Sequence, residues 1–117
     1  MTFLEEGYLL RILIGENIRY KGKPLYEWLV VKAREYGLAG ATVVKGIMGF
    51  GANSRIHTSK IMRLSEDLPV IIEIVDTKEN LEKFLRHVDD VIEVWLATLE
   101  KADVRFYRHK DEKNSGQ

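Results

Sequence analysis

The chain has 117 residues, no cysteine and a formal net charge of zero. These totals suit one compact domain, exclude disulfide and thiol chemistry, and argue against nucleic-acid binding through a broadly basic surface. No apolar run approaches the roughly 20 residues that span a bilayer, so we expect no membrane insertion. The N-terminus lacks the signature of a signal peptide, and we expect a cytoplasmic protein.

Alternating apolar residues predict a first strand over residues 8–14. Residues 15–22 follow as a polar loop. Pro24 then stands at the first position of a helix, where proline is tolerated, and Gly37 ends that helix. The residues predicted to share its apolar face are Leu25, Leu29, Ala33 and Tyr36, flanked by Trp28.

β-Branched residues predict a second strand over residues 39–47, and a third apolar strand covers residues 70–75. Thr77 is the expected N-cap of a second helix that ends near Asp90. A last extended segment covers residues 96–107. The apolar residues of the second helix recur at helical spacing, as Leu81, Phe84, Leu85 and Val88.

The predicted order is β-α-β-β-α-β, which is the ferredoxin-like pattern. We therefore expect an α+β fold with an antiparallel four-stranded sheet and two helices on one face. The domain covers residues 1–110, and residues 111–117 form a flexible polar tail.

The first and third strands are apolar on both of their sides, although two helices can cover only one face of such a sheet. In the third strand, Ile71 and Val75 flank Glu73 on the side opposite Ile72. A strand that is apolar on both sides is normally buried on both sides, so we expect the open face to pack against other subunits. The alternative is a solvated face that tolerates apolar residues.

The loop between the second and third strands is the candidate binding site. Residues 36–65 contain no Asp or Glu, which leaves a local excess of positive charge. Such a loop suits an anion such as phosphate. The alternative is that its cations form a solvated face. The basic side chains of this stretch are Lys45, Arg55, Lys60 and Arg63.

Glycines in this loop can turn backbone N–H groups toward a phosphate, and an aromatic ring can stack on a base. The spacing matches neither a P-loop nor a dinucleotide fingerprint, and the glycines could equally permit a turn or bulge. The loop residues that we expect to contact an anion are Lys45, Gly46, Gly49, Phe50, Gly51, Ser54 and Arg55.

His57 is the only histidine in the loop, and no cluster of metal ligands is visible by spacing. We therefore predict no metal site within one chain, although one His57 from each subunit could build a shared site. No nucleophile stands beside a histidine, and we expect the protein not to be an enzyme.

Nearly the whole chain, about residues 7–107, resembles an uncharacterised family of PII-like proteins. The combined pattern is specific, whereas no single piece of it would be. The segments that carry the resemblance are residues 40–51, 54–58 and 65–76, extended by residues 21–26 and 98–100.

The resemblance implies a homotrimer assembled through its sheets. Members of the wider PII superfamily bind adenine nucleotides in clefts between subunits, so ATP, ADP or AMP is the implied ligand. A mobile loop, here residues 48–64, then senses the ligand and docks on a protein partner. Residues 91–95 lack the glycine-rich turn of well-studied PII proteins, and Arg105 and Arg108 only approximate their basic pair. The resemblance adds Arg105, from the last strand, to the residues that we expect to contact the nucleotide, together with the loop residues named above. The loop also lacks a tyrosine for uridylylation, so nitrogen sensing is not carried over.

The sequence therefore predicts a PII-like regulatory protein that binds an adenine nucleotide or a similar phosphorylated small molecule at intersubunit clefts. One alternative is a trimeric metal-binding protein of the same superfamily shape. Another is a small enzyme that acts on a phosphorylated metabolite.

Overall fold

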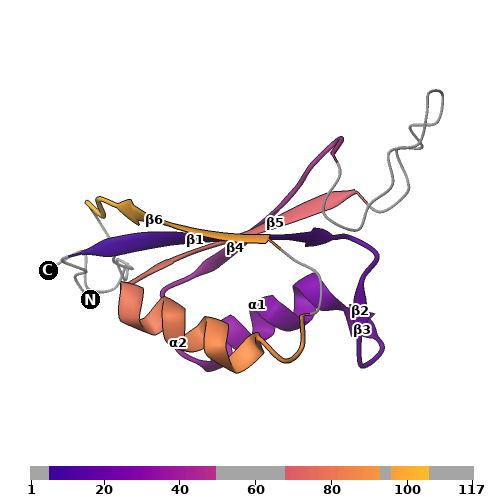
Figure 1. Ribbon diagram of the computed structural model, residues 1–117, viewed down its shortest axis with the longest axis horizontal. Helices are drawn as coiled ribbons and strands as arrows, with labels where there is room; N and C mark the ends of the chain where they lie inside the picture. Colours follow the sequence, from indigo (N-terminus) through magenta and orange to yellow (C-terminus); the bar gives the residue numbers. More distant parts are fainter. Residues whose placement is uncertain (1–5, 50–67, 93–95, 106–117) are drawn as a thin grey trace, which may run out of the picture.

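The computed structural model describes residues 6–49, 68–92 and 96–105. One sheet carries both helices on the same side (Figure 1). The element order confirms the predicted pattern, with a short hairpin added before the first helix. The predicted tail at residues 111–117 lies outside the described residues. The elements are β1 (Gly7–Gly15), β2 (Arg19–Tyr20), β3 (Lys23–Pro24), α1 (Leu25–Glu35), β4 (Ala41–Lys45), β5 (Pro69–Asp76), α2 (Lys78–Val88) and β6 (Leu96–Ala102).

The main sheet has the strand order β4-β5-β1-β6, and every neighbouring pair is antiparallel. This order confirms the ferredoxin-like α+β fold. The two central strands, β1 and β5, pair along their whole lengths, from Tyr8 opposite Asp76 to Gly15 opposite Pro69. The register therefore defines two ends of the sheet. The first residues of β1 lie at one end, and the connection between β4 and β5 starts and finishes at the other.

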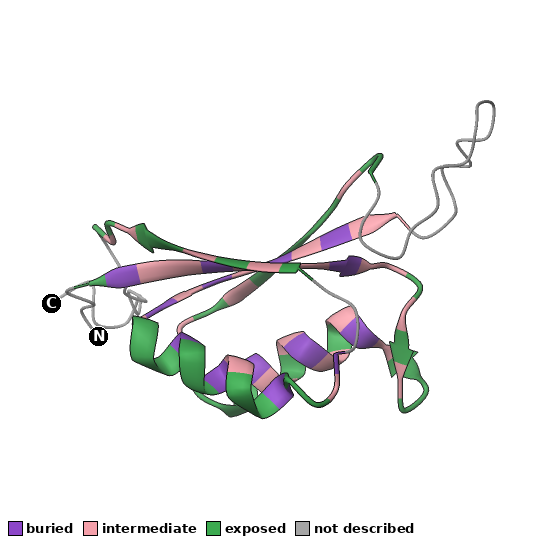
Figure 2. Ribbon diagram, in the orientation of Figure 1, coloured by how far each residue is buried: buried purple, intermediate pink, exposed green. Residues whose placement is uncertain are grey.

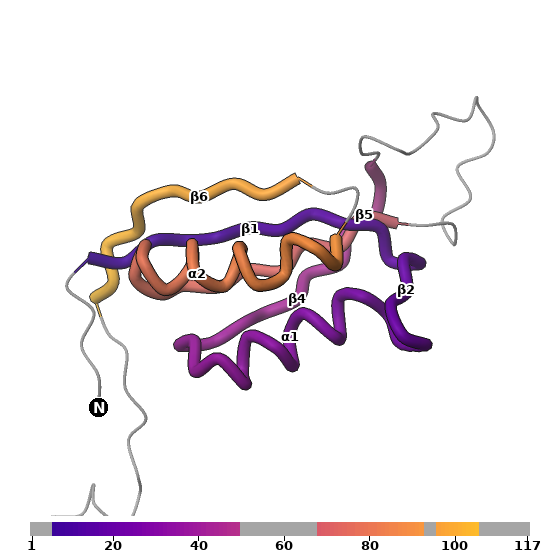
Figure 3. The backbone as a smooth tube through the Cα atoms, turned by 60° about the horizontal axis from the view of Figure 1, so that its bottom comes forward, coloured from indigo at the N-terminus to yellow at the C-terminus, as the bar shows by residue number. Residues whose placement is uncertain are grey.

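The hydrophobic core lies between the sheet and the helices, as the buried residues in Figure 2 show. Every second residue of β1 and β5 points into it, which explains the period of two in both strands. Helix α2 packs on β1 and β5, while α1 packs on β4 and β5 beside it (Figure 3). The largest fully buried side chains of the core are Phe84, Leu10, Ile12, Leu29, Ile72, Ile74, Leu81, Val70 and Val88.

The segment before α1 differs from the predicted polar loop, because β2 and β3 form a two-stranded hairpin there. Lys21 and Gly22 form its turn with φ angles of 52° and 79°, the positive pair that a tight hairpin turn requires. Pro24 is the N-cap of α1 rather than its first residue, with φ −58° and ψ 134°. The hairpin packs on the helix through Tyr20 and Trp28, whose ring centroids lie 4.9 Å apart.

Helix α1 buries three of the four residues predicted for its apolar face, and Gly37 follows its end with φ +78°. The fourth, Tyr36, is 43% exposed, so its predicted burial was wrong. It is the C-cap of the helix, and its ring meets the edge of Phe84 at 5.7 Å. The apolar stripe therefore stops one turn earlier than its period indicated.

Helix α2 begins as predicted, because the Thr77 hydroxyl accepts a hydrogen bond from the Asn80 N–H at 3.2 Å. The residue before it, Asp76, is buried and fully partnered. Its carboxylate accepts hydrogen bonds from the Ala39 N–H, the Thr77 N–H and the Asn80 side chain. Asp76 thereby joins the end of β5 to the start of α2 and to the connection before β4.

Candidate functional site

The two ends of the long loop meet at one end of the sheet, where β4 finishes and β5 starts. Lys45 pairs there with Glu16, at 3.0 Å between the ammonium nitrogen and a carboxylate oxygen. The backbone N–H of Glu16 also donates to the Leu68 carbonyl at 2.9 Å. We call this place, where Lys45 and Gly46 meet Leu68 and Pro69, the neck. Glu16 thus contacts both sides of it. Part of the positive charge expected from the acid-free stretch is neutralised by a carboxylate that follows β1.

Gly46 and Gly49 lie against Pro69 at the same neck. The Gly46 N–H donates to the Pro69 carbonyl at 2.7 Å, so this amide is already engaged. A Cβ atom would lie 2.8 Å from the Pro69 ring at Gly46 and 3.0 Å at Gly49, which is too close for an unshifted side chain. These two glycines therefore permit the close approach of the two sides of the neck.

Most of the predicted loop site lies outside the described residues. The same holds for the histidine considered as a shared metal ligand and for most of the predicted partner-docking segment, residues 48–64. The predicted loop residues concerned are Phe50, Gly51, Ser54, Arg55, His57, Lys60 and Arg63.

A pocket of about 580 Å³ lies on the open face of the sheet, at the end opposite the neck. Its volume falls in the range of about 300–1,000 Å³ that is usual for small-molecule sites. It is open to solvent on one side. Apolar, hydroxyl, acidic and basic groups all line it. Among the lining residues are Leu9, Gly40, Thr42, Glu73, Val75 and Arg105.

Among the predicted site residues that the structure describes, Arg105 is the one that lines this pocket. Its guanidinium pairs with Asp103 at 3.3 Å, and both side chains are about 80% exposed. Such an exposed pair contributes little stability and exchanges partners readily. Lys45 lies at the other end of the sheet, so these two described basic residues, Lys45 and Arg105, are not neighbours within one chain.

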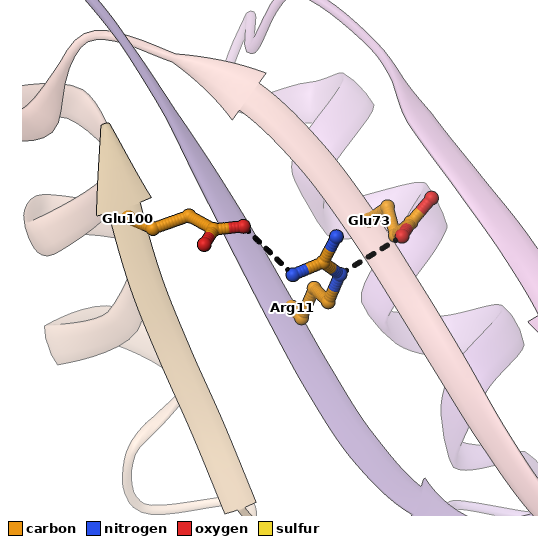
Figure 4. Close-up of polar contacts among 3 residues, drawn as sticks. All are labelled: Arg11, Glu73 and Glu100. Atoms are coloured by element: carbon orange, nitrogen blue, oxygen red, sulfur yellow. Dashed lines mark hydrogen bonds and ion pairs between the residues drawn. The ribbon is translucent and has the colours of Figure 1, made fainter. Parts of the chain in front are cut away.

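Arg11 lies at the centre of the open face between two carboxylates (Figure 4). Its Nε donates to Glu73 on β5 at 3.1 Å, and another guanidinium nitrogen donates to Glu100 on β6 at 2.8 Å. These hydrogen bonds raise the pKa of Arg11 above its ordinary value, with the bond to Glu73 as the larger cause. The cluster ties three adjacent strands together and reaches the pocket wall through Glu73.

An apolar row crosses all four strands of the open face beside this cluster. Leu13 faces Ile71 on one side and Leu96 on the other, and Val44 faces Ile71. The outer two, Leu96 and Val44, are 57% and 44% exposed. The predicted apolar character on both sides of the first and third strands is therefore present, and the open face has no cover from the described residues.

The described residues contain no group of three or more metal-ligating side chains. His87 is the one histidine that the structure describes. Its Nδ1 lies 2.9 Å from the Lys83 carbonyl oxygen, and its ring meets Tyr36. Neither helix of the described part is long and apolar enough to cross a membrane.

Sequence reasoning missed Glu16 and most of the pocket, including Thr42 and Glu73. A signal for the central cluster was present. Arg11 and Glu73 are the only charged residues inside two otherwise apolar stretches, and such pairs commonly face each other across a sheet. Only the strand register shows that these two are opposite one another.

A model of the family DUF190, described as Uncharacterized ACR, matches residues 7–104. A UPF0166 protein of Aquifex aeolicus (strain VF5) is 41% identical over 80 residues, which cover 68% of this chain and 76% of that protein. The UPF0166 protein MJ1524 of Methanocaldococcus jannaschii is 38% identical over 84 residues, which cover 72% of this chain and 77% of that protein.

Solved PII-like structures share the fold. CPII from Thiomonas intermedia K12, bound to ADP and bicarbonate, superposes with a TM-score of 0.61 at 15% identity, covering 85% of this chain and 88% of that chain. A putative PII-like signalling protein from Thermus thermophilus gives a TM-score of 0.57 at 17% identity, covering 83% of this chain and 87% of that chain. At these identities the likeness concerns the fold, and it confirms the PII-like architecture that the sequence resemblance implied.

Proposed function

The chain belongs to the DUF190 family and has a PII-like fold, and from this premise we propose that it is a regulatory protein that binds an adenine nucleotide, or a similar phosphorylated small molecule, between the subunits of a homotrimer. The observation that carries the proposal is that two candidate contact regions lie at opposite ends of the sheet. A pocket with Arg105 opens at one end of the sheet, and Lys45 lies at the other. A ligand that contacts both requires two subunits.

The chemistry of each region suits one part of a nucleotide. Leu9 and Val75 give the pocket apolar walls against which a base can pack, while Thr42 and Glu73 add hydrogen-bonding groups. Lys45 is 56% exposed at its side chain and can exchange Glu16 for a phosphate. Phosphate oxygens compete well for an exposed ammonium group because they form charge-assisted hydrogen bonds.

The open face of the sheet supports the proposed assembly. It presents the apolar row of Leu13, Ile71, Leu96 and Val44 beside a charge cluster that is already paired within the chain. Exposed apolar residues that form a continuous row are typical of a contact surface. Solvent would be excluded from that row when the faces of several subunits meet.

The choice of ligand class is supported by the CPII structures, which hold ADP with bicarbonate, or ADP and AMP with acetate. For this chain ATP, ADP and AMP remain the compounds to test. The remaining predicted contacts, Phe50, Gly51, Ser54 and Arg55, are part of the proposal, as is a protein partner that docks through residues 48–64.

Thermal unfolding with ATP, ADP and AMP tests the proposal. A nucleotide present at about 100 times its dissociation constant should raise the free energy of unfolding by about 2.7 kcal/mol. Gly40 provides a matched pair of variants, because, apart from its own chain neighbours, no described residue has a heavy atom within 4 Å of a Cβ placed there. Gly40→Phe should fill the pocket and abolish the shift, while Gly40→Ala should retain it. If no nucleotide stabilises the native protein, the proposal is wrong.

The assembly is tested separately by mass measurement in solution. A trimer should have three times the 13.5 kDa mass of one subunit. A mass near that of one subunit, at micromolar concentration and without nucleotide, would contradict the trimer.

A further inference from the structure

Glu73 is the one charged side chain of the pocket that is held in place from inside the sheet. It lies directly opposite Arg11 on β1 and Thr42 on β4. Its Oε2 atom accepts the hydrogen bond from Arg11 Nε, and its side chain is 34% exposed. The other charged groups of the pocket, Asp103 and Arg105, are far more exposed and only pair with each other. Among the charged groups of the pocket, the Glu73 carboxylate is therefore the one whose position is fixed.

Arg11 is itself held from two sides, because Glu100 accepts a second hydrogen bond from its guanidinium. A guanidinium is planar and carries its donors in a rigid fork, so two carboxylates on opposite sides fix its orientation. Figure 4 shows Glu73 and Glu100 on either side of the Arg11 side chain, which comes from the strand between them. This arrangement leaves Glu73 little freedom to rotate.

A carboxylate paired with a guanidinium only accepts hydrogen bonds. One Glu73 oxygen is already committed to Arg11, and the other points away from it (Figure 4). A ligand that reaches Glu73 must therefore present a donor. A carbonyl oxygen in the same place would face the carboxylate lone pairs without a hydrogen bond.

We propose that Glu73, positioned by Arg11, makes the pocket select ligands with a donor group, such as the 6-amino group of an adenine ring, over those with a carbonyl there, such as a 6-oxopurine. This inference rests on the proposed function, because it assumes that the base enters this pocket. Arg11 is a positioning residue that acts through Glu73. The competing explanation is that Arg11 only braces the strands.

Binding of AMP and IMP, which differ at position 6 of the base, separates the two explanations. The ratio of their dissociation constants is measured by calorimetry with the full chain. Native protein should prefer AMP by about tenfold or more, the effect of one charged hydrogen bond gained or lost. Glu73→Gln should bring the ratio close to one, because an amide can donate to the 6-oxo group as well as accept.

Three further variants complete the test. Arg11→Gln should reduce the preference for AMP to within about threefold, because Glu73 is then free to rotate and to bind water. Arg11→Lys retains the cation but lacks the rigid fork, so its AMP preference should lie between those of Arg11→Gln and the native protein. Glu79→Gln, on the exposed first turn of α2, is the matched control. It removes a carboxylate on the helix side of the sheet and leaves the Arg11 cluster intact, so the AMP preference should be unchanged.

The outcomes distinguish this inference from the proposed function. If native protein binds both nucleotides and neither Arg11→Gln nor Glu73→Gln changes the ratio, the inference is wrong while the proposed function stands. If native protein binds no nucleotide, both are wrong. Should Arg11→Gln fail to show a cooperative melt, Glu73→Gln decides the matter, because it preserves the shape of the side chain.

Discussion

The two faces of the sheet carry different kinds of side chain on the same strands. The face under the helices is apolar and closed, with Ile72 and Leu10 inaccessible to solvent. The opposite face alternates rows of apolar residues with the charge cluster of Arg11, and a pocket lies at one end of it. The first face stabilises the subunit. The second face is the one that we propose for assembly and ligand binding.

This difference explains why a strand can be apolar on both sides, because the residues on each side have a different role. In β5, the residues that point to the helices fill the core, while Ile71, Glu73 and Val75 point to the open face. A change on one face should therefore affect the stability of the subunit. A change on the other should affect assembly or binding with little effect on that stability.

Adjacent residues of β5 give the sharpest form of this comparison. Ile72→Ala removes buried methyl groups and should lower the free energy of unfolding by about 2–5 kcal/mol. Ile71→Ala, on the open face, should cost about 1 kcal/mol or less. Urea unfolding at a fixed, low protein concentration measures both. Equal losses would show that the two faces are not energetically distinct.

Asp76 is the next largest expected effect, because it is the one buried polar residue of the described part and sits on the helix side. Asp76→Ala removes the acceptor for three hydrogen bonds and leaves the Ala39 and Thr77 amides without this partner. We expect a loss of about 2 kcal/mol from the free energy of unfolding. Glu79→Ala, on the exposed first turn of α2, is the control. A loss below that of the control would contradict the role given to Asp76.

Leu13→Asp on the open face should affect the subunit itself less than the core variants do, by about 1 kcal/mol when subunits are apart. It should nevertheless prevent assembly, because it places a charge in the apolar row between Ile71 and Leu96. Light scattering reports the mass, and circular dichroism reports the fold. A folded variant that keeps the native mass would remove the open face from the assembly.

The fold was predictable from the sequence because the core has a clear period. Apolar residues recur at every second position in the strands and at every third or fourth position in the helices. Both patterns match the buried residues. The β2–β3 hairpin was not predicted, because each of its strands has only two residues, too short to show a period. Its turn uses Lys21 and Gly22, where the usual signal would be Asn-Gly.

The candidate site was less predictable, since most of it depends on register. Lys45 belonged to a stretch without acidic residues in the sequence, yet Glu16, which follows β1, pairs with it. The pocket joins residues 39–42 to the ends of β5 and β6. These segments are far apart in the chain, and no motif links them. Arg105 was found only because its basic character fitted the family resemblance.

The two ends of the sheet carry the central claim, that a complete site needs the neck of one subunit and the pocket of another. Complementation between two defective chains tests it. Lys45→Glu damages the neck, and Gly40→Phe fills the pocket. Each variant alone should bind no nucleotide. Coexpression with two different tags, followed by purification on both, isolates mixed oligomers.

In a mixed trimer of either composition, an intact pocket from a Lys45→Glu chain meets an intact neck from a Gly40→Phe chain in about one cleft in three. Calorimetry with ADP should therefore show binding restored in the mixture, with a reduced number of sites and native affinity. Failure of the mixed oligomers to bind ADP, when the native protein does bind it, would contradict the shared cleft.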